Sequence, residues 1–250
     1  MTPDRSASGN RTTPAVPDWL AEVPFAHRGL HAAGRDPNSV EAVAAAAIAG
    51  YGVEIDVRLS RDQVPVVVHD PRVGHVADTD EAGARKVSDM GAADLQRQGV
   101  APLADVLAAA AGAPLMIEIK SSRPAARMLE PLVAAAMRAY DGPWCVASFN
   151  PLSLRWFRRN APSVPRVLTA QLARSDGVAG AVGRRLEQLR DLHRVEPAAV
   201  SYELDGLPST ATDRWRYRGG LLIAWTAVGP AGVERARQLA DNLIFEQAHP

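Results

Sequence analysis

The stretch from Gly52 to Asp70, GVEIDVRLSRDQVPVVVHD, limits the possible folds more than any other part of the chain. Side chains alternate along a strand, so Glu54 and Asp56 are predicted to point to one face and the apolar residues around them to the other. Carboxylates on a strand whose opposite face is buried are costly unless a cation or a basic group compensates their charge. We therefore expect the rest of the chain to supply such a partner.

The same stretch then reverses direction. Ser60 to Gln63 is a polar turn between two runs of β-branched residues, which predicts a β-hairpin. With the reversal centred in the middle of this turn, His69 is predicted to lie opposite Glu54, on the face that carries the carboxylates. His27 is expected to reach the same place from the preceding strand. Two histidines beside a metal-bound group are suited to act as general acid and general base.

Short apolar runs alternate with segments of helical length, several of them rich in alanine. Besides the stretch above, the runs that indicate strands are residues 24–27, 114–120, 144–149, 166–171, 198–203, 220–226 and 242–246. The segments that indicate helices are residues 39–50, 103–111, 124–140, 151–160, 178–192, 209–217 and 231–239. This alternation predicts a parallel sheet and, at 250 residues, a (β/α)8 or TIM barrel with a hairpin extension after its second strand. A doubly wound open sheet is the alternative, although no strand is followed by a GxGxxG or GxxxxGK motif.

The chain is predicted to form a single domain. Residues 1–18 are polar and rich in threonine, serine and proline, and we expect them to be a disordered lead-in to a barrel that spans residues 19–250. This lead-in lacks the apolar centre of a secretory signal, and no apolar run approaches the length that spans a bilayer. Residues 71–101 are expected to be irregular. These features favour a cytoplasmic protein without integral membrane association.

Composition narrows the possible partners. The formal net charge is +0 at pH 7, which argues against nucleic acid as a partner. Cys145 is the only cysteine, so an intrachain disulfide is impossible and a reducing compartment is expected. No feature of the sequence specifies an oligomeric state.

Polar residues lie where the predicted strands end, and a barrel carries its active site at the carboxyl ends of its strands. Glu54, Asp56 and Glu118 come from two successive strands and are expected to face the same lumen, an arrangement that core packing does not require. Three carboxylates without a cysteine suit Mg²⁺ or Ca²⁺. Arg28 and Lys120 add two cations, which suits an anion such as phosphate. Further polar or aromatic residues at strand ends are Gln171, Glu203, Trp225 and Glu246.

Simpler interpretations exist for each of these residues. Each acid alone is as well explained by a salt bridge with a neighbouring basic residue, and Lys120 by the charge of Glu118. A lone histidine at a strand end most often makes a structural hydrogen bond. The remaining histidines are expected at the surface: His31, His75, His193 and His249.

In their order along the chain, these residues resemble the glycerophosphodiester phosphodiesterases, relatives of phosphatidylinositol-specific phospholipase C. The matching pieces are Ala26-His27-Arg28-Gly29, Asn38-Ser39, Glu54-Ile55-Asp56-Val57, His69-Asp70, Val100-Ala101-Pro102-Leu103, Ile117-Glu118-Ile119-Lys120, Ser148-Phe149-Asn150 and Trp225-Thr226. They run from about residue 24 to the C-terminus. The HRG, ExD and HD motifs together, at these spacings, are a specific signal for this family, whereas Trp-Thr or Ser-Phe alone would be a weak signal.

The resemblance implies a distorted TIM barrel that hydrolyses a glycerophosphodiester to an alcohol and sn-glycerol 3-phosphate. It implies one divalent cation, Mg²⁺ or Ca²⁺, held by Glu54, Asp56 and Glu118. It also implies acid/base catalysis by His27 and His69. The residues expected to contact the substrate are Arg28, Lys120, Phe149 and Trp225.

The chain departs from the family pattern at three places. Pro37 stands where the family usually has glutamate, Phe245-Glu246 stands where it often has Thr-Asp, and Ala227-Val228-Gly229 follows the Trp-Thr pair. These changes concern the rim of the site rather than the metal ligands and histidines. The alternatives are a phospholipase D-like or cyclising phosphodiesterase of the same superfamily, a catalytically silent barrel, and an unrelated barrel enzyme that acts on sugars.

Overall fold

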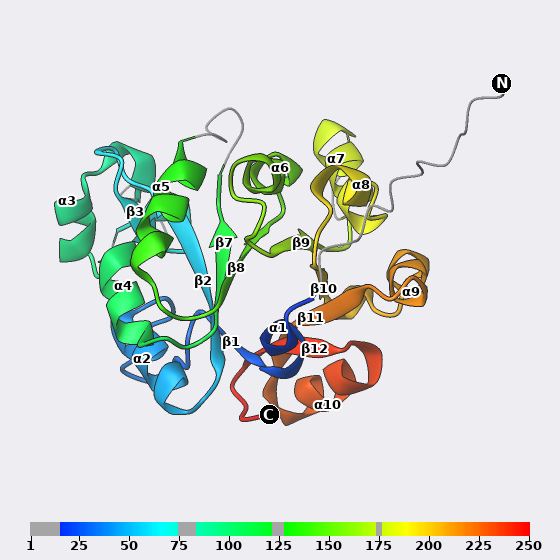
Figure 1. Ribbon diagram of the computed structural model, residues 1–250. Helices are drawn as coiled ribbons and strands as arrows, with labels where there is room; N and C mark the ends of the chain where they lie inside the picture. The colour runs from blue at the N-terminus through cyan, green and yellow to red at the C-terminus, as the bar shows by residue number, and fades with distance from the viewer. Residues whose placement is uncertain (1–15, 75–83, 122–127, 174–176) are drawn as a thin grey trace, which may run out of the picture.

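The computed structural model describes residues 16–74, 84–121, 128–173 and 177–250. Eight parallel strands form a closed barrel, in which β1 pairs with both β2 and β12 (Figure 1). In barrel order the strands are β1 (Phe25–His27), β2 (Gly52–Leu59), β7 (Leu115–Ile119), β8 (Trp144–Ser148), β9 (Arg166–Ala170), β10 (Ala199–Glu203), β11 (Leu221–Val228) and β12 (Asn242–Glu246). The predicted (β/α)8 barrel is confirmed, and closure through β1 rules out the open sheet.

Helices surround the barrel (Figure 1). They are α2 (Val40–Ile48), α4 (Leu103–Ala110), α5 (Leu129–Ala136), α6 (Pro151–Asn160), α7 (Gly177–Glu187), α8 (Leu192–Val195), α9 (Thr210–Tyr217) and α10 (Gly229–Leu239), with 3₁₀ turns η3 (Met137–Ala139) and η4 (Leu204–Gly206). The helix predicted over residues 39–50 shows how the sequence indicates where a helix begins and ends. The Ser39 hydroxyl accepts the Ala42 N–H at 3.1 Å, and Gly50 has a φ of +80° that favours glycine. The predicted start of the helix at residue 124 lies outside the described residues.

One short helix closes the amino end of the barrel. In α1 (Asp18–Glu22), Leu20 is fully buried against residues of the barrel interior such as Phe25 and Met116. The Asn242 side chain, at the start of β12, donates to the carbonyls of Leu20 and Val23 at 2.9 and 2.8 Å. The carboxyl end of the barrel is left to carry the site. Most of the predicted lead-in, residues 1–15, lies outside the described residues, and its disorder stays a prediction.

The hairpin extension after β2 is present, but its predicted register is wrong by one residue. β3 (Pro65–Val67) pairs antiparallel with β2 so that Val57 faces Val67, and the Val68 N–H donates to the Asp56 carbonyl at 2.9 Å. His69 therefore does not face Glu54. The reason is a three-residue loop, closed between Ser60 and Val64, with φ +63° at Gln63.

The segment after the hairpin is more regular than expected. It contains a two-stranded ribbon of β4 (Arg72–Val73) and β5 (Arg85–Lys86), then η2 (Val87–Asp89), α3 (Ala92–Arg97) and β6 (Ala101–Pro102), which extends the sheet beside β3. Val66, Val87, Met90, Leu95 and Val100 form a small core of their own. Their uneven spacing matches neither strand nor helix periodicity, which explains the wrong prediction of an irregular segment.

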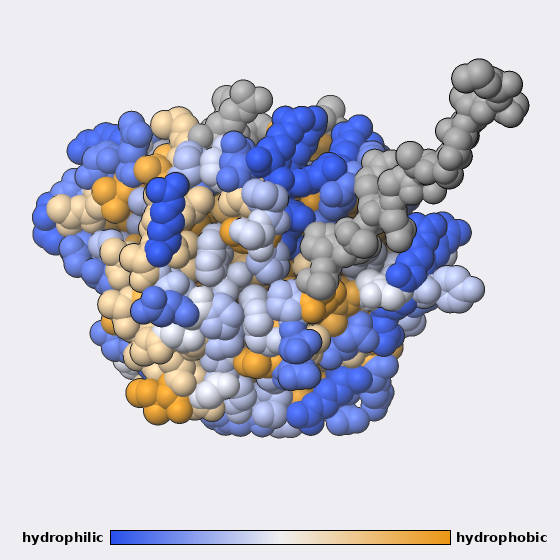
Figure 2. All heavy atoms as spheres, viewed as in Figure 1, coloured by the Kyte–Doolittle hydropathy of each residue, from blue (hydrophilic) through white to orange (hydrophobic). Residues whose placement is uncertain are grey.

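Hydrophobic residues on the face shown in Figure 2 lie in small groups among hydrophilic ones. Scattered exposure of this kind is normal for a protein surface. Within the described part of the chain, no helix has the length and apolar character needed to cross a membrane.

Candidate active site

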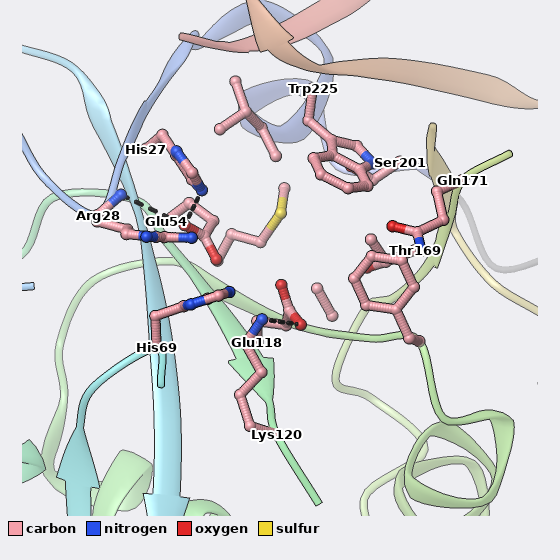
Figure 3. Close-up of a pocket in the computed structure, with 14 residues that line it drawn as sticks. His27, Arg28, Glu54, His69, Glu118, Lys120, Thr169, Gln171, Ser201 and Trp225 are labelled. Atoms are coloured by element: carbon pink, nitrogen blue, oxygen red, sulfur yellow. Dashed lines mark hydrogen bonds and ion pairs between the residues drawn. The ribbon is translucent and has the colours of Figure 1, made fainter. Parts of the chain in front are cut away.

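A cavity of about 200 Å³ lies among the strand ends and loops at the carboxyl side of the barrel (Figure 3). Of the predicted site residues, all except Asp56 line it. In the close-up, His27, Arg28, Glu54 and His69 lie on one side, and Thr169, Gln171, Ser201 and Trp225 lie on the other. The cavity therefore has an ionic wall and a wall of aromatic and uncharged polar side chains.

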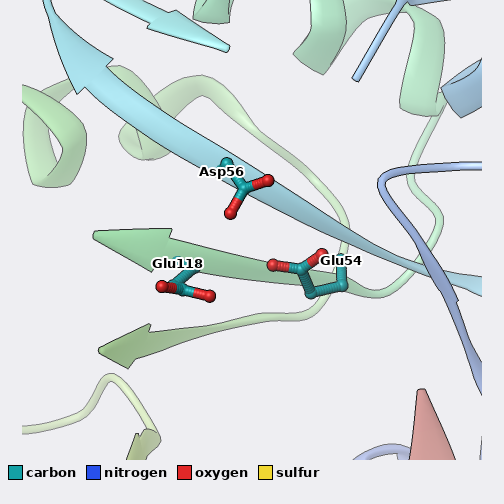
Figure 4. A group of neighbouring side chains, drawn as sticks. All are labelled: Glu54, Asp56 and Glu118. Carbon is teal, nitrogen blue, oxygen red and sulfur yellow. The ribbon is translucent and has the colours of Figure 1, made fainter. Parts of the chain in front are cut away.

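Three buried carboxylates form the base of the ionic wall. Asp56 on β2 is the register partner of Glu118 on β7, and Glu54 lies two residues before Asp56 on the same face (Figure 4). One oxygen from each of the three lies within 4.8 Å of the others. Burial, together with the charges of Asp56 and Glu118, raises the pKa of Glu54 well above its usual value. Burial also raises the pKa of Glu118, so the cluster disfavours its own negative charge.

Two basic residues compensate part of this charge. Lys120 Nζ lies 3.0 Å from Asp56 Oδ1 and 2.7 Å from Glu118 Oε1, and Arg28 Nε lies 3.1 Å from Asp56 Oδ2. Burial tends to raise the pKa of Asp56, but Lys120 and Arg28 outweigh it and the pKa is lowered. Asn38 adds a reciprocal pair, since its amide donates to Asp56 Oδ2 at 2.9 Å and accepts the Asp56 N–H at 3.2 Å. Asp56 and Glu118 therefore do form salt bridges with neighbouring basic residues, as the simpler interpretation expects.

The same three carboxylates fit a divalent cation. Two basic side chains cannot neutralise three carboxylates, and burial together with the charges of Asp56 and Glu118 raises the pKa of Glu54. All three donors are oxygens, which is the ligand type that Mg²⁺ and Ca²⁺ prefer. Within the described parts of the chain, Glu54, Asp56 and Glu118 form a group able to hold such an ion.

His27 is held by a residue from the far end of the chain. Its Nδ1 forms a hydrogen bond with Glu246 Oε1 at the end of β12, and this bond lowers the pKa of Glu246. An ionised carboxylate only accepts hydrogen bonds, so Nδ1 carries the proton. The other nitrogen, Nε2, lies 3.8 Å from Glu54 Oε2 and remains available to a substrate.

His69 reaches the cavity although the hairpin register differs from the prediction. β3 ends at Val67, and the Arg58 guanidinium then holds the His69 carbonyl with two hydrogen bonds of 2.8 and 2.6 Å. The ring Nδ1 lies 2.8 Å from Asp70 Oδ1. Burial lowers the pKa of His69, partly offset by Asp56.

One of the histidines expected at the surface is instead half-buried beside Glu246, the carboxylate that holds His27. His31 Nε2 lies 3.6 Å from Glu246 Oε1, and the side chain is only 17% exposed. The prediction for His31 was wrong because the chain turns back after Gly29, which has a φ of +84°. His193 and His249 are exposed as predicted, and His75 lies outside the described residues.

The opposite wall holds the predicted aromatic pair and residues that sequence reasoning missed. Phe149 and Trp225 meet edge to face with ring centroids 5.5 Å apart. Behind them, Thr169 and Ser201 also line the cavity. Single hydroxyls inside strands look like ordinary strand residues, so no sequence signal singled them out.

Comparisons with known proteins agree with this geometry. The family model described as glycerophosphoryl diester phosphodiesterase family matches residues 27–241. A curated relative, probable glycerophosphodiester phosphodiesterase 2 of Mycobacterium tuberculosis (strain ATCC 25618 / H37Rv), is 29% identical in an alignment of 245 positions that covers 90% of this chain and 88% of the relative.

Solved structures support the fold. An Oleispira antarctica phosphodiesterase in complex with the product sn-glycerol-3-phosphate has a TM-score of 0.71 at 19% identity, over 89% of this chain and 91% of the other. A Thermotoga maritima glycerophosphodiester phosphodiesterase has a TM-score of 0.67 at 21% identity, over 89% and 94%.

The family match covers most of the chain and includes His27, both acids of the ExD motif, the hairpin and Glu118. The expected fold, family and enzyme class are thereby confirmed. This chain belongs to the glycerophosphoryl diester phosphodiesterase family.

Proposed function

We propose that this protein hydrolyses glycerophosphodiesters to an alcohol and sn-glycerol 3-phosphate, with one divalent cation and two histidines. The observation that carries the proposal is a cluster of three buried carboxylates, two of which line one cavity together with both histidines, in a chain of this family. The structural relative that is complexed with sn-glycerol-3-phosphate supports the choice of product.

Glu54, Asp56 and Glu118 are proposed to hold Mg²⁺ or Ca²⁺. When bound, such an ion draws electron density from the phosphoryl oxygens and neutralises part of their charge. Arg28 and Lys120 border the same cavity and are proposed to bind the phosphate as well. Both side chains form ion pairs with Asp56, and these ion pairs hold the two positive charges beside the cavity.

The two histidines are proposed to move the protons. Each ring is held at Nδ1 by a carboxylate, His27 by Glu246 and His69 by Asp70, so each Nε2 is the atom left for the substrate. One Nε2 accepts the proton of the attacking hydroxyl, from water or from the glycerol moiety, as the new P–O bond forms. The other donates its proton to the leaving alkoxide as the old P–O bond breaks. When the glycerol hydroxyl attacks, the product of this step is a cyclic phosphodiester, and water must then attack the phosphorus and break one ring P–O bond to give sn-glycerol 3-phosphate.

The wall opposite the histidines is proposed to enclose the organic part of the substrate. Phe149 and Trp225 present ring surface to the cavity. Lys120 Nζ lies 5.9 Å from the centre of the Phe149 ring. The ammonium group of Lys120 therefore lies between the ionic wall and the aromatic wall.

Phosphorus NMR tests this proposal directly. The purified protein is incubated with glycerophosphocholine, glycerophosphoethanolamine and glycerophosphoglycerol, first after EDTA treatment and then with added Mg²⁺ or Ca²⁺. We expect the sn-glycerol 3-phosphate resonance to appear only with metal. Turnover that resists EDTA would overturn the metal dependence, and a cyclic phosphate as the final product would indicate the cyclising alternative.

A pair of variants tests whether the loss of activity is specific to a carboxylate of the proposed metal site. Glu54→Gln is expected to lower turnover by about 10²-fold or more at saturating metal, because it removes a charged ligand from the proposed ion. The matched control, Glu41→Gln, makes the same change at an exposed position of α2 and is expected to behave like the parent protein.

A further inference from the structure

A second cavity, of about 620 Å³, lies beside the active site, between the end of β2, the ribbon of β4 and β5, and the start of α5. The described residues that line it include no acid and five basic side chains, which are Arg58, Arg61, Arg72, Lys86 and Lys120. We call it the basic cavity. The chain as a whole has a formal net charge of +0, so positive charge is concentrated here. A cavity lined by one sign of charge attracts ligands of the opposite sign.

Most of this charge is not neutralised by the protein. Of the five basic side chains, Lys120 forms ion pairs with carboxylates. The other four form none with the described residues, and Arg58 and Arg72 donate instead to backbone carbonyl groups. Carbonyl groups hold the side chains in place but leave their charge, so an anion from outside the chain is expected to supply the balance.

The ribbon beside the cavity places two of these charges opposite each other. Arg72 and Lys86 are register partners across β4 and β5, and both line the basic cavity. Like charges at directly opposed positions destabilise a pair of strands. Side chains alternate along a strand, so Arg85 points to the other face of the ribbon, and it is not among the lining residues. The fold gives no reason for the pair on the cavity face, whereas an anion between the two side chains would stabilise it.

The basic cavity adjoins the active site at Lys120, which lines both cavities. A hollow of about 400 Å³ also connects them. It shares Glu118, Lys120 and Phe149 with the active-site cavity. It shares Arg58, Lys120 and Ser121 with the basic cavity. A phosphodiester bound beside Lys120 can therefore extend one of its two ester groups towards the basic cavity.

We propose that the basic cavity binds a second anionic group, carried by the leaving alcohol, and that the enzyme prefers glycerophosphodiesters whose alcohol bears a phosphate. This inference rests on the proposed function. Guanidinium groups bind phosphate oxygens through paired hydrogen bonds, and Arg58, Arg61 and Arg72 supply three such groups. The volume of about 620 Å³ leaves room for a phosphorylated polyol.

A matched pair of substrates tests the inference. Glycerophosphoglycerol is compared with the same diester carrying a phosphate on the terminal hydroxyl of one glycerol, and loss of the phosphodiester resonance in phosphorus NMR measures both reactions. For the parent enzyme at low salt, we expect kcat/KM to be about tenfold higher with the phosphorylated substrate, since a charge-assisted contact contributes about this much. The ratio of the two kcat/KM values should fall as sodium chloride is added, because salt screens exposed charges.

The products show which half of the substrate leaves. If the phosphorylated glycerol is the leaving alcohol, hydrolysis gives sn-glycerol 3-phosphate and a second glycerol phosphate, with no free glycerol. Release of free glycerol together with a glycerol bisphosphate would show that the phosphorylated half is retained, and this result would overturn the inference.

Variants of the ribbon assign the preference to the basic cavity. The double variant Arg72→Gln/Lys86→Gln is expected to lower the ratio from about ten to about one. Arg85→Gln is the matched control, because it removes the same charge from the other face of the ribbon and should keep the ratio of the parent. A purely structural role would lower kcat/KM for both substrates alike, and an unchanged ratio in the double variant contradicts the inference.

Two further variants protect the test against a loss of structure. Arg72→Lys keeps the charge and should retain most of the preference. Lys86→Gln replaces the double variant if that protein does not fold, because the Lys86 side chain makes no hydrogen bond with the described residues. This single variant is expected to lower the ratio about threefold, and an unchanged ratio would again contradict the inference.

The outcomes in the parent enzyme separate this inference from the proposed function. A parent that cleaves neither substrate overturns both, whereas equal kcat/KM values for the two substrates overturn the inference alone. Inorganic phosphate distinguishes a free anion from one that the substrate carries. If the ratio is one, and inorganic phosphate raises turnover of glycerophosphoglycerol in the parent but not in Arg72→Gln/Lys86→Gln, the cavity binds a free anion and the assignment to the leaving alcohol is wrong.

Discussion

The two histidines of the site are held in very different ways. His27 lies in the barrel wall, its side chain is 15% exposed, and its carboxylate partner Glu246 comes from 219 positions further along the chain. His69 lies beyond the end of a hairpin strand, its side chain is 41% exposed, and its partner is the neighbouring residue Asp70, which is itself 74% exposed. One histidine thus depends on closure of the barrel, and the other on a local loop.

This difference predicts unequal rigidity. Glu246 and His27 are both carried by barrel strands that pair with each other, so their contact is held by the sheet. Asp70 has no such support, and the loop that carries His69 is held chiefly through its backbone by Arg58. The first histidine should therefore owe its orientation to its carboxylate partner, and the second to its backbone.

Loss of either imidazole should have the largest effect. His27→Ala and His69→Ala are each expected to lower kcat by about 10²–10⁴-fold, since a positioned acid or base contributes about that much. Both proteins should keep the circular dichroism spectrum of the parent, because neither side chain belongs to the hydrophobic core. His193→Ala, at an exposed position, is the control and should retain full activity. Retained turnover in either site variant would refute a shared catalytic role.

Sequence reasoning located the residues whose proximity follows from local periodicity. Glu54 and Asp56 alternate on one strand, and Glu118 lies on the next strand of the barrel, so strand geometry alone brings the three together. The contact between His27 and Glu246 joins the first and last strands, and no spacing along the chain indicates it.

The features that the sequence did not predict depend on backbone conformations or on the closed barrel. Gln63 has a positive φ that glutamine seldom adopts, and this conformation shifted the hairpin register. The turn at Gly29 brought His31 beside Glu246. Thr169 and Ser201 became notable only when the barrel enclosed them without a partner.

Changing the two carboxylate partners separates the histidines more finely. Glu246→Gln is expected to lower kcat by about 10–100-fold, because the glutamine amide can present an N–H to Nδ1 and stabilise the wrong tautomer of His27. Asp70→Asn should lower kcat by less than about threefold, since exposed polar contacts contribute little and Arg58 still holds the loop. Steady-state kinetics at one pH measures both. Equal losses in the two variants would contradict the difference in anchoring.

The smallest effect concerns the pH profile of Asp70→Asn. Burial already lowers the pKa of His69 below the ordinary 6.5, while the hydrogen bond to Asp70 partly counteracts this. Asparagine carries no charge to stabilise the imidazolium, so the substitution should lower the pKa of His69 further. The limb of the kcat/KM profile that titrates His69 must then move to lower pH.

Which limb moves identifies the role of His69. A proton acceptor must be neutral, so its titration forms the acidic limb, and activity at low pH would rise in the variant. A proton donor must be protonated, so its titration forms the alkaline limb, and activity would be lost at a lower pH than in the parent. If neither limb moves, His69 is not one of the groups whose titration controls catalysis, and the paired-histidine mechanism fails.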